Sequence, residues 1–466
     1  MELPKPFDGQ AFLDVVSTKL EEKLSRGKES SSCTMAGTIC DDVLSCLPPC
    51  DANYVREVER KTRGQTENVL WFKHRQQTVC SSEAGRFLTS GAQNFQLSKL
   101  FRDVVFKKPK PFTTTTTTNT PNTFRDQPPS MRAMLQGSVN EGSVFRTIEA
   151  FLPELATRLN VPAADSKLVR PGFVRMVDRP HLGASPDILV TDRTDEDDIF
   201  AVLEVKCLQR CMVEDVASLP VNPADLLEVK DGWDRLGLKT EPLVRLTGGN
   251  VNKSARSTLL KEYGEQSMMT GSQPPFVVTF DVTWFEGSNG FKDARIAGIA
   301  GITDLKPGSL VIAPYHKFGI QVCMQREVVS KLSPVGRSLS SFLVMAIFTK
   351  TKQADVNMGV FLGDASEPAF KLTRDKFLPL GLIFVPFTPS ESYTRDLLTG
   401  LDGNFSLGAL HTALSELYKR GITGSCDDDG PPMTTNEMLA VLKKQYTDPT
   451  PESYIQQGRT RKREHE

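Results

Sequence analysis

Apolar and polar positions along the chain follow two different periods, and each period predicts one type of element. Residues 10–25 repeat apolar side chains at helical spacing, which predicts an amphipathic helix, and a helical pattern returns at 390–420. Residues 184–190 and 199–207 are rich in β-branched and apolar side chains and predict two β-strands. The polar residues 191–198 between them predict a turn. The chain is therefore expected to mix helices with a strand hairpin.

Polar residues interrupt the second predicted strand. Glu204 and Lys206 are two residues apart, so their side chains leave the same face, which Val202 shares. Burying these charges is costly unless they are paired or bind a metal. Asp187 can lie beside Glu204, and with the Val205 carbonyl the pair offers hard oxygen ligands for Mg²⁺ or Mn²⁺. Lys206 can then orient a water or stabilise a phosphate, although a surface hairpin with a salt bridge also fits the pattern.

A second group of residues suggests a phosphate-binding site. Trp71 and Arg75 are four residues apart and share one face of a helix. Arg75, Ser81 and Ser82 supply a guanidinium fork and two hydroxyls, and Ser82 is a candidate N-cap of a helix through Leu88. The alternative is a core Trp with a surface Arg and a capping Ser.

Several motifs resemble, in order, the herpesvirus alkaline nucleases, which are related to phage lambda exonuclease-type viral recombinases of the PD-(D/E)xK superfamily. The motifs are residues 62–71 with the spacing Trp71-x3-Arg75-x6-Ser82, then 137–142, 183–187, 204–207, 312–321, 343–348 and 380–386. The resemblance implies an α/β fold. Its core is restriction-endonuclease-like, with a central mixed sheet flanked by helices and appended helical elements.

The resemblance also implies roles for individual residues. Asp187 and Glu204 are the expected metal ligands, Lys206 is the catalytic lysine, and Glu141 is a further acidic ligand or water-positioning group. A solvated helix position is the alternative for Glu141. The residues expected to contact phosphate or DNA are Arg75, Ser82, Ser81, Ser185, Gln65 and Gln321. Gln321 is also compatible with a surface amide on a helix.

The implied activity is a Mg²⁺-dependent alkaline DNA exonuclease, with Mn²⁺ as the alternative cofactor. It degrades DNA 5′→3′ and processes viral replication and recombination intermediates for maturation and packaging. The implied partners are duplex DNA with 5′ ends and a viral single-strand-annealing DNA-binding protein, and the expected location is the host nucleus and also the host cytoplasm. Two alternatives stay open: an RNA endonuclease in host shutoff, or a nucleic-acid-binding or host-interaction protein with little catalysis.

Composition narrows these possibilities only slightly. The 466 residues carry a net charge of −1, so positive charge for nucleic acid must be local. The candidates are residues 107–110, Arg170, Arg175 and Arg179, and a solvated surface charge is the alternative for each. The nine cysteines include four near the N-terminus whose spacing fits no standard zinc pattern, so free thiols are expected. No signal peptide or membrane-spanning run is apparent, and no membrane association is expected.

The expected organisation has three parts. Residues 1–60 form an N-terminal helical segment, and 61–425 form the nuclease domain, with a flexible Thr- and Pro-rich loop at 107–130. Residues 426–466 form a C-terminal tail, expected to be partly disordered. The tail contains a basic cluster at 459–463, which fits an import signal, a nucleic-acid tail or a solubilising end.

Overall fold

The computed structural model describes sixteen stretches of the chain, and every structural statement below concerns them. They are residues 9–25, 43–45, 47, 50–65, 68–75, 78–90, 94–105, 129–212, 243–245, 273–286, 292–305, 310–312, 316–333, 339–350, 356–357 and 377–419. The predicted tail at 426–466 lies outside these residues. So does the predicted loop 107–130 as far as residue 128, whereas residues 129 and 130 are already helical.

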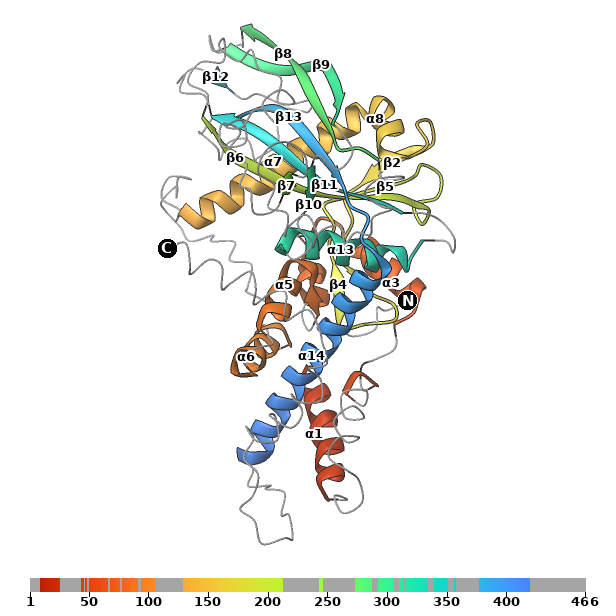
Figure 1. Cartoon of the computed structure of the whole chain (residues 1–466), viewed down its shortest axis with the longest axis vertical. Helices are drawn as coiled ribbons and strands as arrows, with labels where there is room; N and C mark the ends of the chain where they lie inside the picture. The colour runs from red at the N-terminus through yellow and green to blue at the C-terminus, as the bar shows by residue number, and fades with distance from the viewer. Residues whose placement is uncertain are drawn as a thin grey trace.

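Helices occur at both ends of the described chain and on both sides of the central strands (Figure 1). The predicted helices at 10–25 and 390–420 are confirmed as the first and last of them. The helices are α1 (Gly9–Ser25), α3 (Ala52–Lys61), α4 (Val69–Arg75), α5 (Ser81–Ser90), α6 (Asn94–Val105), α7 (Pro129–Ala150), α8 (Leu152–Leu159), α13 (Lys317–Ser330) and α14 (Glu391–Lys419). None of them is long and apolar enough to cross a membrane.

The described strands form one large mixed sheet and two small ones. The large sheet has the order β12-β9-β8-β13-β11-β6-β5-β2, and the small sheets are β1-β4-β3 and β10-β7. The strands are β1 (Val79–Cys80), β2 (Ser166–Val169), β3 (Val174–Arg175), β4 (Leu182–Ala184), β5 (Ile188–Asp192), β6 (Ile199–Met212), β7 (Leu243–Arg245), β8 (Phe276–Glu286), β9 (Lys292–Asp304), β10 (Leu310–Ile312), β11 (Ser340–Lys350), β12 (Val356–Asn357) and β13 (Phe377–Pro386).

The central hairpin confirms one predicted strand and corrects the other. β5 and β6 are antiparallel, with Ile188 opposite Leu203, and β6 continues in parallel with β11. The predicted strand at 184–190 is broken, because β4 ends at Ala184 in one sheet and β5 begins at Ile188 in another. Pro186 lies in the break. A proline has no N–H to donate to a strand ladder, so the chain changes sheets here.

The two faces of the large sheet are covered by different helices. Along β6, Leu203 and Val205 belong to an apolar cluster that includes residues of α7 and α8. Val202 belongs instead to the cluster that contains the apolar residues of α13. Glu204 and Lys206 alternate with Leu203 and Val205, so period-two spacing places them on the α13 side, as the sequence predicted.

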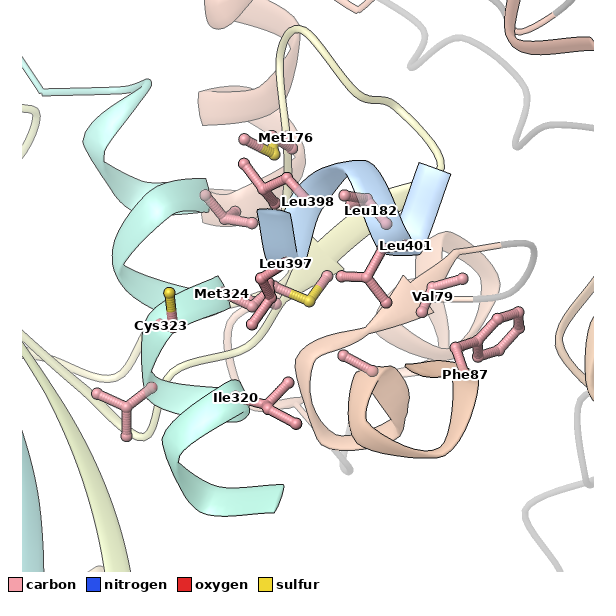
Figure 2. Packing of buried hydrophobic residues seen from close by; sticks show 14 of the residues in the cluster. Val79, Phe87, Met176, Leu182, Ile320, Cys323, Met324, Leu397, Leu398 and Leu401 are labelled. Carbon is pink, nitrogen blue, oxygen red and sulfur yellow. The ribbon is translucent and has the colours of Figure 1, made fainter. Parts of the chain in front are cut away.

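The α13 cluster extends away from the sheet into a helical layer (Figure 2). Short strands β1 and β4 meet helices α5, α13 and α14 there. The labelled side chains are Val79, Phe87, Met176, Leu182, Ile320, Cys323, Met324, Leu397, Leu398 and Leu401, all in the same buried cluster. This packing fixes α13 and α5 against each other. Both helices carry predicted site residues, so the core sets their relative position.

Residues of the predicted N-terminal segment share this core. Phe12 of α1 lies with its ring centroid 6.1 Å from that of Phe405 in α14. Asp51 begins α3 by accepting a hydrogen bond of 2.8 Å from the Tyr54 N–H. At the other end of α3, Glu59 and Thr62 accept hydrogen bonds from the backbone before β3. The start of the chain is therefore attached to the strands that support the predicted site.

Candidate nuclease site

The two predicted acidic ligands lie side by side where β5 and β6 begin to pair. Asp187 directly precedes the Ile188–Leu203 pair, which places it opposite Glu204. One carboxylate oxygen of Asp187, Oδ2, accepts a hydrogen bond of 2.7 Å from the Val205 N–H. The first carboxylate is therefore held by the strand that carries the second.

Glu204 is almost completely enclosed, with 1 % of its surface exposed. Its Oε1 accepts hydrogen bonds from the ammonium group of Lys206 and, at 2.5 Å, from Nε2 of Gln321. Its Oε2 accepts one from Nε2 of Gln325, also at 2.5 Å. Charge-assisted hydrogen bonds of this kind are the strong ones, so the carboxylate is fixed in direction.

Helix α13 supplies both glutamines. His316 caps the helix, its Nδ1 accepting a hydrogen bond of 3.2 Å from the Phe318 N–H. Gln321 and Gln325 are four residues apart and so share one helix face. Gln321 belongs to the predicted site and is not a surface amide. Gln325 is not among the residues predicted from the sequence, although its spacing from Gln321 is a signal that could have found it.

The charges of this group act strongly on one another. Burial, and then the charge of Glu204, raise the pKa of Asp187 well above its usual range. Burial also raises the pKa of Glu141, which the nearby Lys206 opposes. Burial alone lowers the pKa of Lys206, but Glu204 and Asp187 outweigh it and raise that pKa above its ordinary value. The lysine therefore stays charged beside three acidic groups.

Glu141 comes from the helix that packs on the other face of the large sheet from α13. It lies on α7, as the sequence predicted, and is partly buried rather than solvated. Arg170 acts on its charge, and the guanidinium of Arg170 lies 4.7 Å from the ring centroid of Phe145. Of the three arginines proposed as local positive charge, Arg170 is the exposed one closest to the acidic group.

The side chains of the acidic group bear on whether the implied divalent cation fits here. Among the described residues, no three His, Cys, Asp or Glu side chains form a closed group that could hold an ion. However, three carboxylates, Glu141, Asp187 and Glu204, share the charge of one ammonium, Lys206, at the centre of the group. Hard oxygen donors with excess negative charge fit Mg²⁺ or Mn²⁺, with waters or phosphate completing the ligand shell.

The predicted phosphate-binding residues also come together. A guanidinium N–H of Arg75 donates a hydrogen bond of 2.9 Å to Oγ of Ser82, and the guanidinium carbon lies 4.6 Å from the Trp71 ring centroid. Ser82 is exposed in the first turn of α5, where unpaired backbone N–H groups favour an anion. Ser81 begins the helix, so Ser82 is not its N-cap, and Ser81 is buried.

Two further predicted residues connect the phosphate-binding group to the acidic group. Nε1 of Trp71 donates a hydrogen bond of 2.9 Å to Oγ of Ser185. Nε2 of Gln65 donates to the carbonyls of Pro171 and Pro186, at 3.0 and 3.1 Å. Both contacts hold the segment directly before Asp187. Gln65 therefore supports the backbone, and its amide nitrogen is already engaged rather than directed at a phosphate.

Two of the proposed DNA-binding arginines have structural contacts instead. Arg175 is buried, and it donates hydrogen bonds to the His74 carbonyl at 3.2 Å and to the Thr78 hydroxyl at 3.1 Å. Arg179 donates to Asp402 at 2.9 Å and pairs with Asp178. A buried guanidinium cannot reach a phosphate backbone, and the expectation for Arg175 is therefore wrong.

Residues 16–210 match the family model of the viral alkaline exonucleases. Over this region the chain is similar to that family. The matched region contains every predicted catalytic residue and all the predicted phosphate contacts except Gln321. The match agrees with the resemblance to the herpesvirus alkaline nucleases and supports a nuclease. No curated protein matches the chain at the threshold applied.

Solved structures show a fold similar to that of this chain. The KSHV SOX RNA complex has a TM-score of 0.50 at 16% identity, covering 81% of this chain and 79% of that one. The shutoff and exonuclease protein from Kaposi's sarcoma associated herpesvirus has a TM-score of 0.49 at 15% identity, covering 89% and 88%. A SOX-DNA complex has a TM-score of 0.45 at 13% identity, covering 91% and 94%. The first likeness agrees with the predicted central mixed sheet flanked by helices.

Proposed function

We propose that this chain is a viral alkaline exonuclease, a Mg²⁺-dependent enzyme that degrades duplex DNA from its 5′ ends, with Mn²⁺ as an alternative. One observation carries the proposal. The exposed Arg75–Ser82 pair is joined through Trp71 and Ser185 to the segment that ends at Asp187. A site for a terminal phosphate next to a group of carboxylates is what removal of nucleotides from a 5′ end requires.

Each residue has a role in this reaction. Asp187 and Glu204 would hold the cation, with Glu141 as a further oxygen ligand or a water-positioning group. The cation supplies an activated water and polarises the phosphoryl oxygens. Lys206 stabilises the charge that develops on the phosphate, because its ammonium stays protonated. Arg75 and Ser82 bind the 5′-phosphate and fix the distance from the chain end to the scissile bond.

The bond changes explain why one pocket suffices for repeated cleavage. Water attacks the phosphorus, the P–O3′ bond breaks, and the released 3′ oxygen takes up a proton. The remaining strand then carries a new 5′-phosphate on its next nucleotide. That phosphate is again a ligand for the Arg75–Ser82 pair, so every product on the long strand has the chemistry of a substrate.

Digestion of linear duplex DNA tests the proposal. One strand carries a 5′-phosphate, the other carries a 5′-hydroxyl, and each is labelled at its 3′ end. The digestion is run in Mg²⁺ at alkaline pH. Wild type should shorten the phosphorylated strand faster than the hydroxyl strand. Glu204→Gln and Lys206→Ala should abolish cleavage, and Arg75→Ala should digest the two strands at equal rates. Arg395→Ala is the matched control, because Arg395 is exposed on α14 and its ion pair is with neighbouring Asp396. Cleavage that needs no metal, or survives Glu204→Gln, would contradict the proposal.

A second candidate function is endonucleolytic cleavage of RNA. A similar solved structure, with a TM-score of 0.50, is a complex of KSHV SOX with RNA, which supports this second candidate. A closed, structured RNA offers no 5′ end, so cleavage of it depends on the acidic group alone. Arg75→Ala should leave RNA cleavage unchanged if this activity exists, and it should reduce DNA digestion.

The biological setting is part of the proposal. An enzyme that resects 5′ ends leaves 3′ single strands, which a viral single-strand-annealing DNA-binding protein would pair during recombination and before packaging. This setting places the enzyme in the host nucleus, with a further pool in the host cytoplasm. Purification of the full chain from infected nuclei would test the partnership. An annealing protein should co-purify with the full chain and should be absent from fractions that lack the nuclease.

A further inference from the structure

Gln325 is a buried amide whose contacts the proposed reaction does not explain. It lies on α13 with none of its surface exposed. Its Nε2 donates a hydrogen bond of 2.5 Å to Oε2 of Glu204. Its own Oε1 is buried and has no hydrogen-bond partner among the described residues. An unpaired buried carbonyl is destabilising, so an apolar side chain of this size would suit the core better.

The N–H of the Gln325 amide is the group that makes a hydrogen bond. Glu204 presents two oxygens, and the contacts divide between them. Oε1 receives Lys206 and Gln321, which both lie towards the partly exposed side of the group. Oε2 receives only Gln325 from the buried interior of α13. Without Gln325, Oε2 would lose this hydrogen bond, and the plane of the carboxylate could turn about its last torsion.

We infer that Gln325 is a positioning residue that fixes the Glu204 carboxylate and so sets the affinity of the acidic group for a divalent cation. This inference rests on the proposed metal-dependent function. Gln325 touches neither substrate nor cation; it acts through Glu204. Partners that orient a metal-binding side chain in this way typically change metal affinity or activity by about 10–100-fold when they are lost.

The test compares full-length variants without nucleic acid and then with it. Gln325→Met keeps the volume and removes the N–H, and Gln325→Asn keeps an amide that is too short to reach Glu204. Met324→Leu is the matched control, because Met324 is buried in the α13 cluster and the swap conserves volume. Mn²⁺ binding is measured by calorimetry, and the Mg²⁺ concentration for half-maximal cleavage is measured on 5′-phosphorylated duplex DNA.

Both Gln325 variants should bind Mn²⁺ about 10–100-fold more weakly and need correspondingly more Mg²⁺. Saturating metal should restore much of the rate, and Met324→Leu should match wild type. Unchanged Mn²⁺ binding in a folded Gln325→Met or Gln325→Asn protein overturns this inference and leaves the proposed function standing. Absence of Mn²⁺ binding and cleavage in wild type overturns the inference together with the proposed function.

Discussion

The indole N–H of Trp71 donates a hydrogen bond of 2.9 Å to the hydroxyl oxygen of Ser185, two residues before Asp187. The same indole ring lies 4.6 Å from the guanidinium carbon of Arg75. One aromatic side chain therefore touches both the phosphate-binding pair and the segment that ends at an acidic ligand. Because Ser185 accepts this bond, its own O–H remains available to donate, for example to a phosphate oxygen.

Trp71→Phe should weaken the selection of 5′-phosphorylated ends. Phenylalanine keeps a ring under Arg75 but loses the N–H to Ser185 and binds cations less well. The loss of one such hydrogen bond corresponds to about 1 kcal/mol, or a roughly fivefold fall in the ratio of rates on phosphorylated and hydroxyl ends. Competitive digestion of the two substrates measures it. Val69→Ala is the control on the same helix, because Val69 is exposed. An unchanged ratio in Trp71→Phe would show that the Ser185 contact is dispensable.

Gln65→Met should slow cleavage without changing end selection. The substitution removes both hydrogen bonds to the Pro171 and Pro186 carbonyls, so the segment before Asp187 loses its support. A displaced reacting group costs about tenfold or more in kcat. Single-turnover rates on phosphorylated and hydroxyl ends should fall together. A selective fall on phosphorylated ends would instead assign Gln65 to phosphate binding, as the sequence alone suggests.

Acid should destabilise the protein through His74. Burial, and then the charge of Arg175, lower the pKa of His74 from 6.5 to about 4. The unfolded chain gains a proton near pH 6.5 and the folded protein does not. The contribution of neutral His74 to the free energy of unfolding is therefore fully present above pH 6.5, and it is lost as the pH falls towards 4. The full loss is about 3 kcal/mol in the free energy of unfolding.

Urea denaturation of wild type and His74→Gln at pH 7 and pH 5 checks this expectation. The amide does not titrate, so the variant should lose less stability between the two values. Buried His181, whose pKa is also lowered, contributes to both proteins and cancels in the comparison. Parallel loss of stability in the two proteins would show that His74 is accessible to protons in the folded state.

Gly172→Ala should be strongly destabilising. A Cβ at this position would lie 2.1 Å from the backbone carbonyl oxygen of Glu59 and 2.3 Å from the Thr62 hydroxyl. Those atoms belong to the end of α3 and cannot move without breaking its hydrogen bonds to Gly172 and Phe173. The expected cost is about 3 kcal/mol, at the upper end for overpacking. Gly298→Ala, where a Cβ meets nothing within 4 Å, is the control, and thermal melts compare them.

Local periodicity in the sequence was sufficient to predict the groups that lie on single elements. The alternation along β6 places Glu204 and Lys206 on one face, and the four-residue spacing in α4 places Arg75 on Trp71. These relationships depend only on the period of one strand or one helix. The structure reproduces them because each element keeps its period when it packs.

Relationships between distant elements were harder to predict. Gln325 meets Glu204 only because α13 packs across β6, and no local pattern encodes that packing. The strand at 184–190 was predicted as continuous because its residues are apolar, whereas Pro186 redirects the chain between sheets. Arg175 looked like a surface charge, and only the fold shows that it ties the end of α4 to β3.

The parallel pairing of β6 with β11 has a consequence for the newly made chain. β6 ends at Met212, and β11 begins only at Ser340, after α13. A ribosome therefore releases the whole region matched by the family model while one edge of β6 still lacks its partner. An unpaired, apolar strand edge invites association with other chains. Protein synthesis that stalls between these strands should yield insoluble fragments, whereas passage beyond β11 closes the edge and brings the glutamines of α13 to Glu204.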